Sequence, residues 1–124
     1  MSYAIRVHEF GGPEKMQWEE VENRTPGRGE ALVRQTAVGL NFIDVYERTG
    51  LYPGNLPRAL GKEAAGVVEA VGAGSNGIKV GDRVAYALQA SGAYADEWVV
   101  PTAHLVPIPD DVSDRLAAAS LLKA

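Results

Sequence analysis

Hydrophobic and polar positions alternate along much of this chain in short segments. Seven segments have either the two-residue period or the apolar, β-branched composition that is typical of strands: residues 4–10, 16–21, 30–38, 64–71, 83–88, 93–100 and 104–106. Glycine and proline cluster between them, as at residues 11–13 and 26–29, and predict turns. Many short strands with few helices predict a barrel or a sandwich.

One stretch in the middle of the chain changes to the helical period. Its spacing is three or four residues, at positions 42, 45, 46 and 49. Asn41 is placed to cap this helix, with Asp44 three residues on, and Gly50 is placed to end it. Tyr46 falls on the same face as Phe42, and this pattern favours a core position for Tyr46.

A second helix is predicted to begin near Ser113 and to run to the last residue of the chain. It is rich in alanine and leucine and carries no capping residue at its end. An apolar helix without a cap is an unusual end for a domain. We therefore expect residues 1–124 to be one domain, cut at the junction to a second one.

Composition and charge narrow the possible partners. The length of 124 residues suits one domain, and a net charge of −4 without a run of like charges argues against a nucleic-acid or polybasic membrane surface. No apolar run is long enough to span a bilayer, and residues 1–6 lack the pattern of a signal peptide, so a cytoplasmic location is the default expectation.

The chain has no cysteine, and its two histidines, His8 and His104, are far apart. We expect no metal site.

Residues 72–77 (GAGSNG) match a dinucleotide-binding pattern, which works only where a helix follows the glycines directly. Here Gly81 and Asp82 arrive before a helix could form. The segment is therefore interpreted as a glycine-rich hairpin.

Three further stretches stand together: residues 41–46 (NFIDVY) with 50–53 (GLYP), residues 61–68 (GKEAAGVV) and residues 80–84 (VGDRV). In this order and spacing they resemble the medium-chain dehydrogenase/reductase superfamily, and within it the zeta-crystallin-like NADPH:quinone oxidoreductase branch. The resemblance covers essentially the whole chain. It implies a mainly β fold, a GroES-like, partly open β-barrel with a few short helices. In that family the barrel packs against a Rossmann domain, which is absent from this chain.

The resemblance also implies a site. Zinc-dependent members of the superfamily carry a cysteine where Asn41 stands and a histidine where Lys62 stands, so a zinc-independent enzyme is implied. Its reaction would be hydride transfer from NADPH to a quinone. Asn41 would contact the nicotinamide ribose, and Tyr46 and Tyr52 would line the nicotinamide and acceptor pocket, where either hydroxyl could donate to the nascent quinol oxygen. Lys123, at the domain junction, would lie near the cofactor.

Several alternatives stay open at this point. Asn41 can be a helix cap alone, since capping and ribose contact are compatible. The same fold could act on an enone or an enoyl thioester, or it could be a free-standing GroES-like binding module, against which the last helix argues. The intact enzyme is expected to be a homodimer, the choice of NADPH over NADH would rest with the missing domain, and the fragment alone is expected to be inactive.

Other side chains have simpler interpretations. Glu63 is expected to form a structural ion pair, and Lys62 to be solvated or paired. Both histidines are expected in strands, with structural roles. The two tryptophans, Trp18 and Trp98, are interpreted as core or interface residues.

Overall fold

The computed structural model describes residues 2–52, 54–75, 77–87 and 91–120, and in these ranges strands predominate over helices. The strands are β1 (Ser2–Val7), β2 (Met16–Val21), β3 (Glu30–Gly39), β4 (Arg58–Ala59), β5 (Glu63–Val71), β6 (Arg83–Ala87), β7 (Glu97–Pro101) and β8 (Val106–Pro107), and the α-helices are α1 (Phe42–Thr49) and α2 (Asp114–Ser120). Short 3-10 turns lie at Pro13–Lys15 and Thr102–His104. The predicted end of the last helix, residues 121–124, lies outside the described residues.

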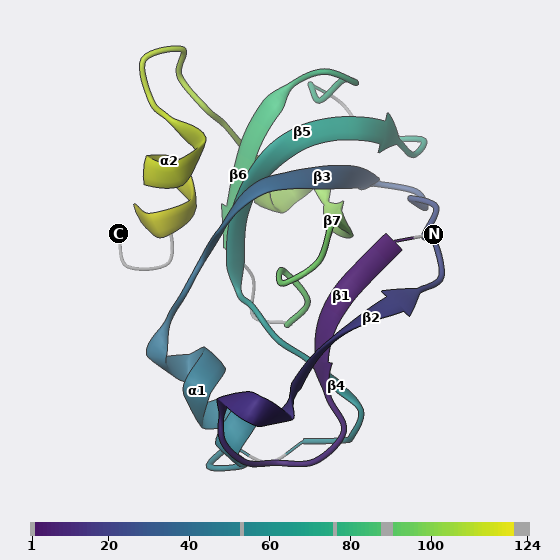
Figure 1. Cartoon of the computed structure of the whole chain (residues 1–124). Coiled ribbons are helices and arrows are strands. Elements are labelled where there is room, and N and C mark those ends of the chain that lie inside the picture. Colours follow the sequence, from purple (N-terminus) through teal and green to yellow (C-terminus); the bar gives the residue numbers. More distant parts are fainter. Residues whose placement is uncertain (1, 53, 76, 88–90, 121–124) are drawn as a thin grey trace.

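The larger sheet has five antiparallel strands in the order β7-β3-β5-β6-β8. The register of β3 against β5 shifts twice, between Leu32 and Val33 and between Gln35 and Ala37. Such irregularities bend a strand and increase its twist. Accordingly β3 and β5 curve together through the molecule (Figure 1).

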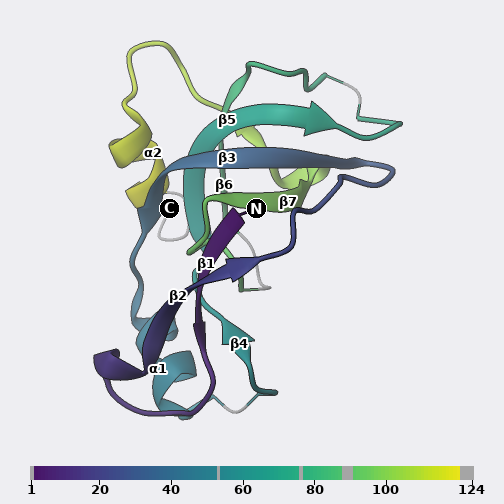
Figure 2. The same ribbon diagram turned by 45° about the vertical axis from the view of Figure 1, so that its right-hand side comes forward.

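The smaller sheet has three strands in the order β2-β1-β4, and it lies below the curved part of the larger sheet (Figures 1 and 2). β1 and β2 pair along their whole lengths, from Ser2 with Val21 to Val7 with Met16. Within the described ranges the two sheets meet along a short stretch, where Ala4 forms an isolated bridge with Ala95 and Ser2 Oγ donates to Glu97 Oε1 at 2.7 Å. The sheets therefore do not close completely, and the prediction of a mainly β, partly open barrel is confirmed.

Packing on both sides of β5 holds the barrel together. The inner core consists of small and branched side chains together with the ring of Tyr86. Its members come from the larger sheet and, at residues 93 and 105, from the segments beside it: Ala31, Val33, Ala64, Val68, Val84, Tyr86, Ala93, Val100 and Leu105. Ala65 follows Ala64 in β5 and lies on the other face of the sheet. There it packs with Ala85, Ile108 and, from α2, Ala118. Because both faces of β5 are covered, its sequence is an apolar run rather than a strict alternation.

Three strand predictions were partly wrong. The segment 93–100 is a strand only from Glu97 onward, because its first half crosses between the sheets, where the Tyr94 carbonyl accepts from Ile5 N–H at 2.8 Å. His104 lies in a 3-10 turn, where Leu105 N–H donates to the Thr102 carbonyl at 3.1 Å, and not in a strand. His8 follows the end of β1, since its pairing with β2 stops at Val7.

The glycine-rich segment after β5 is a hairpin connection, as predicted. No helix forms in residues 72–75 or 77–82, the described part of this connection. The Gly72 N–H donates to the Glu30 carbonyl at 2.8 Å, and the Gly29 N–H donates to the Ala73 carbonyl at 2.7 Å. These bonds dock the connection on the start of β3, which takes up the Gly72 N–H.

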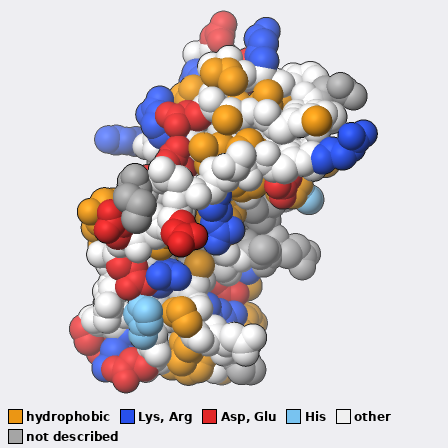
Figure 3. Space-filling view, turned by 90° about the vertical axis from the view of Figure 1, so that its right-hand side faces the viewer, with side chains coloured by type: hydrophobic (Ala, Val, Ile, Leu, Met, Phe, Trp, Pro, Cys, Tyr) orange, Lys and Arg blue, Asp and Glu red, His pale blue; other side chains and the backbone are white. Residues whose placement is uncertain are grey.

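Acidic and basic side chains are interspersed over the face shown in Figure 3, which gives this face no single sign of charge. The tryptophans differ. Trp18 is exposed and stacks on Tyr3 with ring centroids 5.6 Å apart, whereas Trp98 is half-buried against the inner core. No helix within the described ranges is long and apolar enough to cross a membrane.

Candidate functional site

Helix α1 buries a polar face and leaves exposed the apolar face that its sequence pattern predicts to be buried. Its buried side chains are Asp44 and Glu47, whereas Phe42 is 80% exposed and Tyr46 is only half-buried. The predicted core position of Tyr46 beside Phe42 is therefore wrong. The reason is that α1 sits at the end of the barrel, where the residues that face it are charged and polar.

The ends of α1 are determined locally. Asn41 and Asp44 form a capping box in which the Asp44 Oδ2 accepts from the Asn41 backbone N–H at 3.0 Å. Gly50 ends the helix in the left-handed conformation with φ of 87°, which an L-residue with a side chain adopts only at a cost. Both capping predictions are confirmed.

The side chain of Asn41 also contacts the larger sheet. Its Nδ2 donates to Glu63 Oε2 at 2.6 Å, and both residues are buried. Glu63 is the first residue of β5, next to Gly39 at the end of β3. The helix start and the sheet are thus joined by a buried amide–carboxylate hydrogen bond, of the short kind typical of an ionised acceptor.

A second buried cluster surrounds Glu47 on the inner side of α1. Its Oε2 lies 3.1 Å from Lys62 Nζ and 3.1 Å from an Arg58 guanidinium nitrogen, and its Oε1 accepts from Ser91 Oγ at 2.6 Å. Lys62 was predicted to be either solvated or paired. It is only 6% exposed and lies beside Glu47, so it is paired. Because charges are costly to bury, replacing Glu47 by a neutral residue would leave Lys62 and Arg58 each with one compensating partner fewer.

Tyr94 completes the inner side of α1. Its hydroxyl donates to Asp44 Oδ2 at 2.5 Å, and burial, with the carboxylate of Asp44 adding to it, raises the pKa of the Tyr94 phenol far above its usual range. Sequence analysis missed both Tyr94 and Glu47. Asp44 and Tyr94 are far apart along the chain, and no local pattern links them.

Tyr46 and Tyr52 come together, as the resemblance implied for a shared pocket. Their ring centroids are 5.5 Å apart at an interplanar angle of 65°, an edge-to-face contact. Arg58 Nη1 donates to the Tyr52 carbonyl at 2.5 Å, and Tyr52 N–H donates to the Tyr46 carbonyl at 3.3 Å. Among the described residues neither phenol oxygen has a hydrogen-bond partner, so both hydroxyls are available to a ligand.

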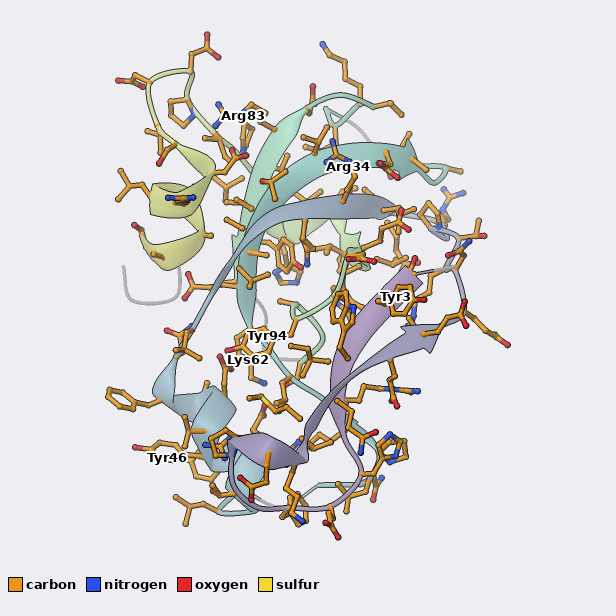
Figure 4. The ribbon with its side chains drawn as sticks, viewed as in Figure 1. Tyr3, Arg34, Tyr46, Lys62, Arg83 and Tyr94 are labelled. Atoms are coloured by element: carbon orange, nitrogen blue, oxygen red, sulfur yellow. The ribbon has the colours of Figure 1, made fainter. Side chains whose placement is uncertain are left out.

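Figure 4 shows how these groups are arranged around the helix. Tyr46 lies on α1, and Lys62 and Tyr94 lie above it, toward the larger sheet. An open cavity of about 640 Å³, lined among others by Val38, Leu40 and Tyr94, adjoins the helix on this side. Tyr46 and Tyr52 are not among its lining residues, so the paired tyrosines belong to a different surface.

The donor set at this end of the barrel does not fit zinc. The Lys62 ammonium has no lone pair and is held by Glu47, and the Asn41 amide nitrogen is held by Glu63. Zinc takes thiolate, imidazole or carboxylate ligands. Within the described ranges, no group of three or more histidine, aspartate or glutamate residues could hold a metal ion. Lys123, the remaining predicted site residue, lies outside the described residues.

Fold and site together define a barrel of the GroES-like class, in which a capped helix and two paired tyrosines stand at one end. The model of the alcohol dehydrogenase GroES-like domain family matches residues 27–110, and the chain belongs to this family.

Relatives extend the match to the whole chain. A quinone oxidoreductase of Pseudomonas aeruginosa is 47% identical over 124 residues, which is 99% of this chain and 38% of the relative. A 2-haloacrylate reductase of Burkholderia is 42% identical over 116 residues, which is 90% of this chain and 35% of that protein. The crystal structure of Escherichia coli quinone oxidoreductase complexed with NADPH superposes with a TM-score of 0.94 and 45% identity, over 98% of this chain and 37% of that structure. The chain thus spans less than half the length of these proteins.

Proposed function

We propose that this chain is the acceptor-side domain of an NADPH-dependent quinone reductase, and that the cofactor-binding domain lies in the rest of the protein. The observation that carries the proposal is the 47% identity to a quinone oxidoreductase, which extends over 99% of the chain. The similar fold of an NADPH-bound quinone oxidoreductase supports the choice of cofactor.

The named side chains have distinct roles in this proposal. NADPH supplies the hydride when it is bound. Asn41 contacts the nicotinamide ribose, and Tyr46 and Tyr52 form an aromatic edge against which a flat acceptor ring can pack. Because the Tyr46 and Tyr52 hydroxyls have no partner among the described residues, either can donate to an acceptor oxygen as negative charge develops there. Lys123 is retained as a cofactor contact on the resemblance alone.

The enzyme is proposed to work without zinc. A quinone accepts hydride readily, because the developing charge spreads over its ring and oxygens. The protein then needs mainly to orient donor and acceptor and to exclude water. The pairing of Lys62 with Glu47 and of Asn41 with Glu63 supports this view, since both positions are engaged in buried contacts.

A second candidate acceptor has its own support. The 42% identity to a 2-haloacrylate reductase favours a substituted acrylate, which is an activated carbon–carbon double bond, within the same fold. In that case a tyrosine hydroxyl would bind the carboxylate or carbonyl oxygen rather than a quinol oxygen. Both candidates require the same arrangement of donor, acceptor and paired tyrosines.

The full-length protein that carries this chain provides the test. NADPH oxidation is measured with 1,4-benzoquinone, with 2-chloroacrylate and with a simple enone at matched concentrations. The proposal expects the quinone to give the highest kcat/KM. A higher value for the acrylate would replace it with the second candidate, and no oxidation with any of the three would contradict both.

The isolated chain should neither bind NADPH tightly nor reduce quinones. Its described residues contain no strand–glycine–helix element for a pyrophosphate, since the segment after β5 is docked on β3. Calorimetric titration of residues 1–124 with NADPH is expected to give no measurable heat of binding. A micromolar dissociation constant would contradict the assignment of the cofactor to another domain. Dimerisation of the intact enzyme through that domain remains part of the proposal.

A further inference from the structure

The hydrogen bond between Asn41 and Glu63 fixes the orientation of an amide. An amide side chain can present either its oxygen or its nitrogen, but a carboxylate only accepts hydrogen bonds. With Nδ2 at 2.6 Å from Glu63 Oε2, the nitrogen end of Asn41 is directed to the sheet. The nitrogen carries two hydrogens, and Glu63 takes one of them.

Glu63 is itself held in place by its neighbours. It is 1% exposed, and it pairs with Gly39 of β3 on one side and Ala87 of β6 on the other. A Cβ atom on residue 39 would lie 2.4 Å from Glu63 Cγ and 2.4 Å from the Ala118 carbonyl oxygen of α2. Only glycine therefore leaves room for the Glu63 side chain between β3 and α2.

The backbone of Asn41 is held as firmly as its side chain. Asp44 Oδ2 accepts from the Asn41 N–H at 3.0 Å and from the Tyr94 hydroxyl at 2.5 Å. Two buried carboxylates thus converge on one asparagine. Burying a carboxylate costs several kcal/mol before its contacts compensate, and apolar residues of similar volume often stabilise a fold at least as well. Such an arrangement suits a residue whose orientation matters to a ligand.

We propose that Glu63 is a positioning residue that makes Asn41 an obligatory hydrogen-bond donor, whose second amide N–H binds the nicotinamide ribose of the bound nucleotide. This inference rests on the proposed function, because that function supplies the ligand of Asn41. Glu63 touches no reacting atom and acts only through Asn41.

The test exchanges donor and acceptor in the full-length protein. Glu63→Gln, Asn41→Asp and the double variant N41D/E63Q are compared with wild type in thermal unfolding and in NADPH binding followed by nucleotide fluorescence. Glu69→Gln is the matched control, since Glu69 lies on the same strand but is exposed and pairs with Arg34. Asn41→Asp places two carboxylates in the 2.6 Å contact, and the double variant restores an amide–carboxylate pair of reversed polarity.

The proposal expects a lower Tm for Asn41→Asp and recovery of most of that loss in the double variant. It also expects Glu63→Gln to weaken NADPH binding three- to tenfold with little change in kcat. A glutamine donates as well as accepts, so it no longer requires a donor from Asn41, and the capping-box contact is then the remaining constraint on the amide. NADPH affinity should stay at least tenfold reduced in the double variant, since residue 41 can no longer donate. Glu69→Gln should behave as wild type.

Three results would overturn the proposal: wild-type NADPH affinity in Glu63→Gln, no recovery of Tm in the double variant, or full recovery of NADPH affinity there. The binding readout does not depend on the acceptor. A protein that binds NADPH but reduces no quinone would therefore contradict the proposed acceptor and still test the role of Glu63. A protein that binds no NADPH would overturn both.

Discussion

At the scale of single residues, Tyr46 and Tyr52 differ from Tyr86 and Tyr94 in the partners of their hydroxyls. Tyr86 is buried and Tyr94 is half-buried, and burial raises the pKa of each phenol. The hydroxyls of Tyr86 and Tyr94 bond to Gln35 and Asp44, respectively. The paired rings of Tyr46 and Tyr52 carry hydroxyls that no described residue engages, so their hydrogen bonds are left for a ligand.

Removal of the Tyr52 hydroxyl should slow quinone reduction. We expect Tyr52→Phe in the full-length protein to lower kcat/KM by about fivefold, since one hydrogen bond contributes about 1 kcal/mol. Tyr46→Phe tests the other hydroxyl in the same way. Tyr3→Phe is the control, because Tyr3 is also exposed but stacks on Trp18. Unchanged kinetics in both single variants would remove the pair from the site.

At the scale of elements, each α-helix is fixed by polar contacts at its start. Asn41 and Asp44 cap α1, and Asp114, the first residue of α2, bonds to two strands. Its Oδ2 accepts from Thr36 Oγ1 at 2.7 Å, and its Oδ1 accepts from Arg83 Nη2 at 2.7 Å. These bonds, the one from Thr36 foremost, lower the pKa of the Asp114 carboxyl.

The contribution of Asp114 should therefore depend on pH. A carboxyl whose pKa is lowered by folding stabilises the fold above the pKa of the unfolded chain, about 4, and loses that contribution as pH falls through the folded value. Asp114→Asn should lower the free energy of unfolding by about 1 kcal/mol at pH 7, because the ion pair is partly exposed. The difference from wild type should shrink below about pH 4.

Urea unfolding at a series of pH values measures this difference. Asp110→Asn is a suitable control, because Asp110 is an exposed aspartate in the loop before α2. A loss of stability in Asp114→Asn that is the same at pH 3 and pH 7 would contradict the electrostatic explanation.

The C-terminal cap of α1 offers a second test. Gly50 and Gly77 both have left-handed backbones, with φ of 87° and 82°. A Cβ on Gly50 would lie 2.9 Å from Phe10, whereas one on Gly77 would have no described residue other than its chain neighbours within 4 Å. Gly77→Ala should cost about 1 kcal/mol, and Gly50→Ala about 2 kcal/mol, since only Gly50 adds a steric contact. Equal losses in urea unfolding would show that Phe10 moves aside freely.

The sequence was sufficient where the determining signals are local. Met16–Val21 was predicted as a strand and is one with those bounds, and α1 begins after Asn41 and ends before Gly50 as the capping residues indicate. The sequence was insufficient where residues far away in the chain determine which face of an element is buried. The buried side of α1 follows from Lys62 and Arg58, which lie beyond the helix in the chain, so the periodicity of α1 alone assigned the wrong face.

At the scale of the whole molecule, one end of the barrel exposes large apolar side chains. Leu40, Phe42 and Leu51 are 73%, 80% and 64% exposed. Phe42 begins α1, and Leu40 and Leu51 lie just before and just after this helix in the chain. Helix α1 is at the end of the molecule opposite the β5–β6 connection (Figure 1). Under the proposed function this surface is covered by the rest of the protein.

The substitution Phe42→Ser tests whether the rest of the protein covers this apolar surface. In residues 1–124 alone the substitution should change the free energy of unfolding by less than about 0.5 kcal/mol, since the ring is exposed. In the full-length protein it should cost about 2 kcal/mol, the value for a buried apolar side chain. Val80→Ser, at an exposed position in the β5–β6 connection, should have a small effect in both. Equal effects of Phe42→Ser in the two proteins would place the cover elsewhere.

The reversed orientation of α1 has a consequence for how such a domain can change over evolution. The helix is anchored by Asp44 and Glu47 on its inner side, so its outer positions carry little of the folding free energy. Under the proposed function, substrate preference and foldability are then encoded by different residues of α1 and of the loop that follows it. Libraries randomised at positions 46 and 52 should yield mostly folded proteins, and new acceptors can be selected there without a stabilising background.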